Sequence, residues 1–313
     1  MRAVVVQSSG QLELAAVPEP VAGPGQVVVE AEAAGAGFVD VMLRRGEYPG
    51  SPATGSIPGV EVVGEVRSAG PGVAGDLIGR RVLALPAFGG YAELAVADAA
   101  RVLPVPDGAD AADTVALGVN SLVAEISLAR AGTKAGDHVL VRGASGGIGV
   151  LATQIAAARG AEVAAVTSSA ARGERLRALG ARLTIDRTSP AVSGETYDVV
   201  IDPVAGPGVV PYLESLRDNG RYVLCGAAGG LPAPGFFPAL LGRFHTSPAV
   251  LAFSLNSVAP EDLRTSWRVI TELWAQGALS PVVDERLPLS EASHALRLLE
   301  RGGPFGKVVL QLR

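Results

Sequence analysis

The stretch VLVRGASGGIG at residues 139–149 is an apolar strand that runs into a glycine-rich turn. The segment that follows, IGVLATQIAAARG at 148–160, has the length and apolar spacing of a buried helix. Counted from Ala144, the turn reads A-S-G-G-I-G, the G-x-G-x-x-G dinucleotide pattern with alanine in its first position. A strand, this turn and a helix in that order predict a site for the phosphates of a dinucleotide.

The glycines of the turn have separate physical tasks. Gly146 lets the backbone approach a pyrophosphate, and Gly149 lets the helix pack closely on the strand. The helix N-terminus offers unpaired N–H groups and the positive end of its dipole to the phosphates. The turn residues expected to contact the cofactor are Ala144, Ser145, Gly146, Gly147, Ile148 and Gly149.

The same letters fit a second nucleotide-binding pattern, the G-x-x-x-G-x-G of short-chain dehydrogenases, as Gly143, Gly147 and Gly149. That fold would place the turn near the N-terminus and follow it with a Tyr-x-x-x-Lys pair. The turn lies mid-chain, and neither Lys134 nor Lys307, the only lysines, has a tyrosine four positions before it. The short-chain interpretation is therefore rejected.

The residues after the next strand indicate which nicotinamide cofactor binds. An NAD site usually carries an acidic residue about 20 residues past the glycines, where it holds the ribose hydroxyls. Here the chain reads Thr167, Ser168 and Ser169, then Arg172, and Glu174 comes several residues too late. Hydroxyls and a guanidinium suit a 2′-phosphate through hydrogen bonds and charge pairing. The sequence predicts NADPH, unless Arg172 is simply a solvated residue.

Composition excludes several classes of function. The 313 residues are 48% hydrophobic and 18% charged with a net charge of −5, so no basic surplus favours nucleic acid. The single Cys225 cannot form an internal disulfide or a cysteine-rich zinc site. The N-terminus lacks a secretory apolar region, and no run of about 18 apolar residues suggests a membrane span. A cytoplasmic enzyme is expected.

The pattern of apolar and turn-forming residues changes near residue 111. Before it, short β-branched segments alternate with glycine and proline turns; after it, strands alternate with helices, which predicts a doubly wound parallel sheet. The expected domains are 1–112 with 262–313, and 113–261 inserted between them. Strands are expected at 27–33, 60–68, 81–85, 91–97, 138–142, 162–167, 197–202, 221–226, 282–287 and 307–311. Helices are expected at 38–45, 111–131, 147–159, 171–179, 209–217, 261–276 and 290–300.

The chain resembles the medium-chain dehydrogenase/reductase superfamily, and within it the zeta-crystallin-like quinone oxidoreductases that hold no zinc. The blocks that carry the resemblance are 33–49, 57–66, 79–96, 139–156, 197–206, 220–230 and 305–310. It implies an α/β fold in which a Rossmann doubly wound parallel sheet is inserted into a GroES-like β-rich catalytic domain. It also implies NADPH, a homodimer that joins the nucleotide-domain sheets, and cofactor contacts by Gly226 and Lys307 within their blocks.

The resemblance also bears on metal. Zinc members of the superfamily use a cysteine and a His-Glu pair, but here Gly35, Ala36 and Gly37 stand at the cysteine and Val60 precedes Glu61. His138, His245 and His294 are far apart, without metal-ligand spacing. No metal site is predicted, and Glu61 is expected to be a structural acceptor near the cofactor.

The residues expected near the substrate differ from those of the related quinone reductases. They carry asparagine where this chain has Gly37, and often an aromatic or polar residue at Met42. Asn120 remains a candidate to approach the nicotinamide, although Val123 replaces a common threonine. The acceptor is therefore not restricted to a simple quinone.

Hydride transfer from NADPH to a quinone or to a C=C conjugated with a carbonyl is the chemistry that these residues allow. Tyr48 either donates the proton or only packs beside Pro49, whereas Asp40 is expected to be a structural acceptor and Cys225 a buried strand residue. The apolar segment 236–241, together with Phe253, is expected either to line the substrate pocket or to form a dimer contact. A non-catalytic NADPH-binding protein is the alternative function.

Overall fold

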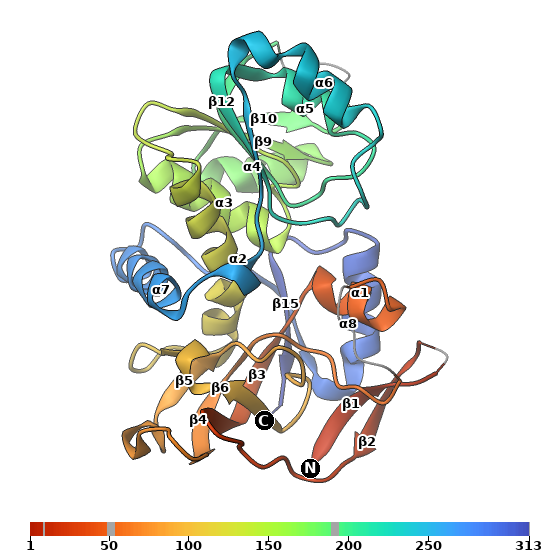
Figure 1. The fold of residues 1–313 in the computed structure, drawn as a ribbon, viewed down its shortest axis with the longest axis vertical. Helices are drawn as coiled ribbons and strands as arrows, with labels where there is room; N and C mark the ends of the chain where they lie inside the picture. Colours follow the sequence, from red (N-terminus) through yellow and green to blue (C-terminus); the bar gives the residue numbers. More distant parts are fainter. Residues whose placement is uncertain (9, 49–53, 189–193, 313) are drawn as a thin grey trace. The chain divides into compact units, whose positions relative to one another are not determined.

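The computed structural model describes residues 1–8, 10–48, 54–188 and 194–312. The chain divides into two compact units (Figure 1). The first unit comprises Met1–Val119, Pro260–Trp267 and Pro281–Arg313, and the second comprises Asn120–Ala259 and Arg268–Ser280. Both ends of the chain therefore contribute to the first unit.

The first unit is built around a seven-stranded sheet of order β14-β15-β3-β4-β5-β7, with β6 paired to β3. The C-terminal strand β15 runs antiparallel to β3, with Val308 opposite Ala36, and lies between β14 and β3, so the chain end is held inside the sheet. Helix α1 (Phe38–Arg45) begins and ends where the sequence predicts. Besides α1, the α-helices and strands that lie wholly in this unit are β1 (Arg2–Val6), β2 (Leu12–Ala16), β3 (Gln26–Ala36), β4 (Val62–Ala69), β5 (Arg81–Ala84), β6 (Leu94–Asp98), β7 (Val102–Pro104), β14 (Val283–Pro288), α8 (Ala292–Glu300) and β15 (Lys307–Gln311), while α7 (Pro260–Ala275) begins in it.

The second unit is a six-stranded, wholly parallel sheet of order β10-β9-β8-β11-β12-β13. From β8 the chain builds outward to β10, then returns to the other side of β8 and builds outward to β13. The order therefore reverses between β8 and β11, which confirms the doubly wound sheet and marks its switch point. Its elements are β8 (His138–Val141), α3 (Gly147–Ala158), β9 (Glu162–Thr167), α4 (Ala170–Ala178), β10 (Ala181–Asp186), β11 (Tyr197–Asp202), α5 (Val210–Glu214), β12 (Leu216–Leu224), α6 (Phe236–Gly242) and β13 (Ala249–Ala252).

The structure differs from the sequence prediction in several elements. Strands β1, β2, β7, β10 and β13 and helix α6 were not predicted. The helix predicted over 209–217 is wrong in its second half, because α5 ends at Glu214 and β12 begins at Leu216. Leu216 is 1% exposed and pairs with Tyr197 of β11, so burial in the sheet outweighs helix propensity there.

Helix α2 (Ala111–Arg130) is broken at Gly118, whose φ of 13° and ψ of −130° are not helical. The boundary between the units falls just after this break, at Val119, rather than at the expected residue 112. Within the described ranges, α2 is the one helix that is long and apolar enough to cross a membrane. Of its most apolar 18-residue window, 78% is buried inside the molecule, as in the core helix of a globular protein.

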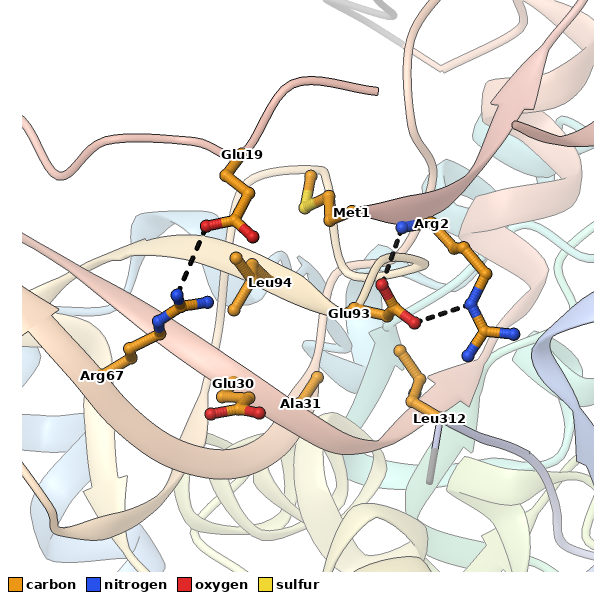
Figure 2. Close-up of a pocket in the computed structure, with 9 residues that line it drawn as sticks. All are labelled: Met1, Arg2, Glu19, Glu30, Ala31, Arg67, Glu93, Leu94 and Leu312. Atoms are coloured by element: carbon orange, nitrogen blue, oxygen red, sulfur yellow. Dashed lines mark hydrogen bonds and ion pairs between the residues drawn. The ribbon is translucent and has the colours of Figure 1, made fainter. Parts of the chain in front are cut away.

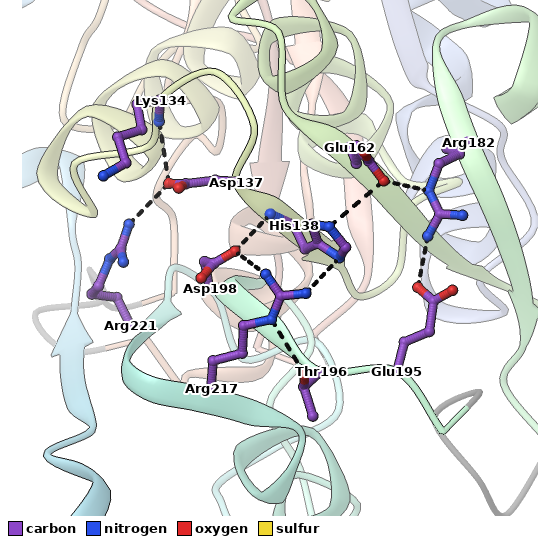
Figure 3. A network of polar contacts seen from close by, with 10 residues as sticks. All are labelled: Lys134, Asp137, His138, Glu162, Arg182, Glu195, Thr196, Asp198, Arg217 and Arg221. Carbon is purple, nitrogen blue, oxygen red and sulfur yellow. Dashed lines mark hydrogen bonds and ion pairs between the residues drawn. The ribbon is translucent and has the colours of Figure 1, made fainter.

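A network of ion pairs joins the amino ends of the parallel strands (Figure 3). Asp198 of β11 accepts hydrogen bonds from the backbone N–H of His138 and from Arg217, each at 2.8 Å. Arg217 also bonds Nδ1 of His138, and Glu162 pairs with Arg182 at 3.0 Å. These side chains are partly exposed, so each pair contributes about 0–1 kcal/mol to stability. His138 is thus a member of a structural network at the sheet edge opposite the glycine turn.

Candidate active site

The glycine turn lies at the carboxyl end of β8, between Val141 and the first residue of α3. Gly146 is the N-cap of α3, with an extended backbone (φ −78°, ψ 171°) and an exposed position. A Cβ built on Gly146 would meet only the carbonyl oxygen of Gly143, at 3.4 Å. The fold itself therefore does not require glycine at 146, and the space above it is free for a ligand.

Gly149 and Gly147 are glycines for a different reason. A Cβ on Gly149 would lie 2.6 Å from the Cα of Ala144, so only glycine lets the helix pack this closely on the turn. A Cβ on Gly147 would overlap the side-chain amide of Asn120, so Asn120 lies directly against the first residue of α3. Asn120 thus lies beside the turn, and its approach to the nicotinamide stays a prediction. Ile148, which follows Gly147, is half-buried.

The remaining predicted residues of the turn form part of its support. Ala144 is fully buried, and its N–H donates to the carbonyl of Val166 at 3.0 Å. The hydroxyl groups of Ser145 and Thr167 share a hydrogen bond of 2.6 Å, and each residue is 6% exposed. These contacts tie the turn to the end of β9.

The predicted 2′-phosphate residues lie where β9 gives way to α4. Ser168 and Ser169 are exposed, and Ser169 is the N-cap of α4. The backbone N–H of Arg172 donates to the Ser169 hydroxyl oxygen at 3.4 Å. The two serines and Arg172 therefore lie at the carboxyl edge of the sheet, where open α/β sheets bind ligands.

Gly226 follows β12 at the same edge. A Cβ there would lie 2.5 Å from the carbonyl oxygen of Pro203, so glycine is needed for the loops after β11 and β12 to approach each other. Its predicted contact with the cofactor stays a prediction.

In the first unit, Glu61 and Lys307 form a buried ion pair, with 1% and 3% of their side chains exposed. The other carboxylate oxygen of Glu61 accepts a hydrogen bond of 2.7 Å from the N–H of Val119, just past the break in α2. A Cβ on Gly35 would lie 2.6 Å from Lys307 Cε, so glycine at 35 makes room for the pair. Glu61 is the structural acceptor that the sequence predicts. Lys307 is engaged by Glu61, and its cofactor contact stays a prediction.

Asp40 is fully buried at the start of α1 and has three donors. It accepts from the N–H groups of Gly37 and Gly59, each at 2.9 Å, and from the Tyr91 hydroxyl at 2.8 Å. Burial raises the pKa of Asp40 from 3.8 to about 6, although the three hydrogen bonds oppose the shift. The predicted structural role of Asp40 is confirmed: it fastens α1 to the segment around Gly59.

Because the pKa of Asp40 is raised, we expect the stability of the protein to depend on pH. The Asp40→Asn variant has no titrating group at this position and should lack this dependence. Because the pKa is raised on folding, the stabilising contribution is complete below pH 3.8 and is lost as the pH rises through about 6. A shift of about two units corresponds to about 3 kcal/mol. As the pH rises from 4.5 to 7.5, the free energy of unfolding of the wild type, measured in urea, should fall relative to that of the variant by a large part of this amount. A constant difference across that range would contradict the assignment.

Tyr48, the predicted proton donor, is half-buried just after α1. Pro49, its alternative packing partner, lies outside the described residues. Cys225 is buried, and burial raises the pKa of its thiol to about 12, so a nucleophilic role is not supported.

A cavity of about 430 Å³ lies elsewhere in the first unit (Figure 2). Ion pairs between Arg2 and Glu93 and between Arg67 and Glu19 lie along it. None of the predicted site residues lines it, and four of its charged side chains are already paired with one another. The candidate active site is therefore assigned to the carboxyl edge of the parallel sheet and not to this cavity.

Sequence reasoning missed two features of the site. Arg142 stands inside the quoted stretch but was given no role, although an arginine directly before a glycine turn is a visible signal. The break in α2 was also missed; its signal is Gly118 within an otherwise continuous helical pattern.

Two family models match the chain. Residues 23–107 match the alcohol dehydrogenase GroES-like domain, and residues 179–310 match the family described as zinc-binding dehydrogenase.

Relatives of known name fall into two groups. Quinone oxidoreductase of Rattus norvegicus is 29% identical, with 100% of this chain and 98% of the relative covered. Phthioceranic/hydroxyphthioceranic acid synthase of Mycobacterium tuberculosis is 31% identical over 96% of this chain. The chain spans only 15% of the length of that synthase.

Among solved structures, the quinone oxidoreductase of Thermus thermophilus, described together with its NADPH complex, is similar over the full length of both chains. Its sequence is 33% identical and its TM-score is 0.86. The likeness thus includes both units, and with the second unit the segment that holds the glycine turn.

Proposed function

Because the chain belongs to the medium-chain dehydrogenase/reductase superfamily, we propose that it is a zinc-independent reductase that uses NADPH to reduce a quinone or an α,β-unsaturated carbonyl compound. The observation that carries the proposal is the glycine turn, in which Gly146 is exposed although the fold does not need a glycine there. The similar Thermus thermophilus protein is described with NADPH, which supports the choice of cofactor. A cytoplasmic location belongs to the same proposal.

The residues present fit NADPH. Gly146 admits the pyrophosphate to the N-terminus of α3, and Ser168, Ser169 and Arg172 offer donors to the 2′-phosphate. When bound, NADPH supplies the hydride, while the protein orients the reactants and limits water. Asn120 is proposed to orient the nicotinamide end and Tyr48 to deliver the proton to the acceptor.

The proposal of zinc independence rests on residue chemistry. Although one matched family is described as zinc-binding, Gly35, Ala36 and Gly37 offer no side-chain ligand and Val60 stands before Glu61. Glu61 is also committed to Lys307 and Val119. Within the described ranges no group of three His, Cys, Asp or Glu side chains could hold a metal.

The proposal includes two classes of hydride acceptor, a quinone and an α,β-unsaturated carbonyl compound. The quinone oxidoreductases among the relatives favour a quinone, whereas the similarity to a segment of an acid synthase leaves an enone or enoyl acceptor open. Consumption of NADPH with a simple quinone, compared with a simple enone or enoyl thioester, decides between them. If NADPH binds and neither acceptor is reduced, the non-catalytic alternative replaces the enzyme.

Arg172→Ala is expected to weaken NADPH binding about 10- to 100-fold, the value of one charged hydrogen bond, and NADH binding less than about threefold. Titration of both cofactors by thermal shift or fluorescence measures the difference. Arg175→Ala, one turn further along α4, is the matched control and should change neither. Equal losses for NADPH and NADH would show that Arg172 does not read the 2′-phosphate.

A homodimer through the second unit is part of the proposal. Phe237, Leu241 and Phe244 are 63%, 55% and 76% exposed, and β13 beside them in the fold is an edge strand of the parallel sheet. An apolar surface next to an open sheet edge suits a second copy of the same chain. Phe237→Glu with Phe244→Glu should convert a dimer into a monomer in light scattering. A monomeric wild type would refute this part of the proposal.

A further inference from the structure

Arg142, the residue between β8 and the glycine turn, is held by three groups of the second unit. Its guanidinium donates to Asp202 at 2.9 Å and to the carbonyl oxygen of Ala205 at 2.5 Å, and it lies 4.6 Å from the centre of the Tyr212 ring. Only 12% of the side chain is exposed. Arg142 therefore bridges β8 to the loop after β11, across the switch point of the sheet.

The same carboxylate shapes that loop. Asp202 is fully buried, and one of its oxygens accepts from the N–H groups of Val204 and Ala205 at 2.8 and 2.9 Å. Its other oxygen accepts from the Tyr222 hydroxyl at 2.6 Å as well as from Arg142. Ala205 is held at φ 54°, a left-handed conformation that a residue with a Cβ rarely adopts. Such strain persists only where the surroundings fix it.

The fixed loop lies against the glycine turn. The Cγ2 atom of Val204 is 2.6 Å from the position that a Cβ on Gly143 would occupy. Gly229 donates to the carbonyl of Val204 at 2.6 Å, and Gly206 donates to the carbonyl of Gly230 at 2.8 Å. The loops that follow β8, β11 and β12 thus form one body at the carboxyl edge, where a dinucleotide would lie.

We propose that Arg142 is a positioning residue for hydride transfer. Through Asp202 and Ala205 it holds loop 203–206 against the glycine turn, so that the nicotinamide end of the cofactor would lie against a loop of fixed conformation. The pyrophosphate is held separately, by Gly146 and the N-terminus of α3. Loss of Arg142 should therefore make the bound nicotinamide more mobile, while the affinity for NADPH as a whole should change little. This inference rests on the proposed function.

The test compares Arg142→Met with the double variant Arg142→Met/Asp202→Asn, which removes the unpaired buried carboxylate as well. Both should lower kcat about 10-fold or more, because small misplacements of reacting atoms are costly. The Kd for NADPH should change less than about threefold. Arg221→Met, which breaks the 3.0 Å pair with Asp137 at the amino end of the sheet, is the control and should leave kcat unchanged.

Two outcomes overturn the inference: kcat recovers with stability in the double variant, or the Kd rises as much as kcat falls. Amide hydrogen exchange and NADPH fluorescence anisotropy add readouts that need no turnover. Both variants should exchange faster in 203–206 and 225–230 and bind NADPH with lower anisotropy than the wild type. If the wild type binds NADPH but reduces neither acceptor, the proposed function fails. Hydrogen exchange and anisotropy still test the role of Arg142 in that case. Unchanged exchange and unchanged anisotropy in both variants would refute that role.

Discussion

Gly146→Val is expected to abolish detectable binding of NADPH and NADH alike while the protein remains folded. The backbone at 146 is extended and allowed for any residue, and a Cβ there would touch only the Gly143 carbonyl, at 3.4 Å. The added isopropyl group would instead fill the space in front of the N-terminus of α3. Because the backbone there must approach the pyrophosphate closely, the affinity should fall at least about 100-fold, or about 2.8 kcal/mol.

The measurement is the thermal shift that each cofactor produces, with the melting temperature of the cofactor-free protein as the check on folding. Gly75→Val, in a position with no neighbour within 4 Å of the new Cβ, is the control and should keep the full shift. Gly149→Ala should behave in the opposite way to Gly146→Val and destabilise the cofactor-free protein, because its Cβ would meet the turn itself. A normal shift in Gly146→Val would remove the glycine turn from the cofactor site.

The parts of the site that the sequence predicts are those encoded locally. The glycine turn is read from eleven consecutive residues, and Ser169 caps α4 at the position where the sequence expects hydroxyls. Asp40 and Glu61 were also predicted as acceptors, but their donors were not. Tyr91 lies 51 residues from Asp40, and Lys307 lies 246 residues from Glu61. No local pattern indicates partners that only the tertiary fold brings together.

The missed elements have physical reasons of their own. β10 carries exposed and half-buried positions, because an edge strand is covered less than a central one, and so it lacks the apolar run of β8. The break in α2 is invisible to periodicity because apolar residues continue on both sides of it. At the break Gly118 has a non-helical backbone, and the Glu61 carboxylate accepts the Val119 N–H. The glycine is visible in the sequence, but the carboxylate comes from 58 positions earlier in the chain, and no local pattern indicates it.

The ion pair at that break should be the most sensitive point of the first unit. Lys307→Met leaves Glu61 as a buried carboxylate without its cation, and Glu61→Gln leaves a buried ammonium without its anion. Removing one partner of a buried pair costs about 3–5 kcal/mol. Each variant should lower the free energy of unfolding by an amount in this range in urea. Arg264→Met, which breaks an exposed pair with Glu261, should cost less than about 1 kcal/mol.

The double variant Glu61→Gln/Lys307→Met separates the two roles open to Lys307. It removes both charges, so the loss of stability should be clearly smaller than the sum of the single losses, while the glutamine can still accept from Val119. If Lys307 serves only the pair, the double variant should bind NADPH as the wild type does. If Lys307 also contacts the cofactor, affinity should fall in Lys307→Met and stay low in the double variant even though stability recovers. Additive losses of stability would instead show that the two buried charges do not depend on each other.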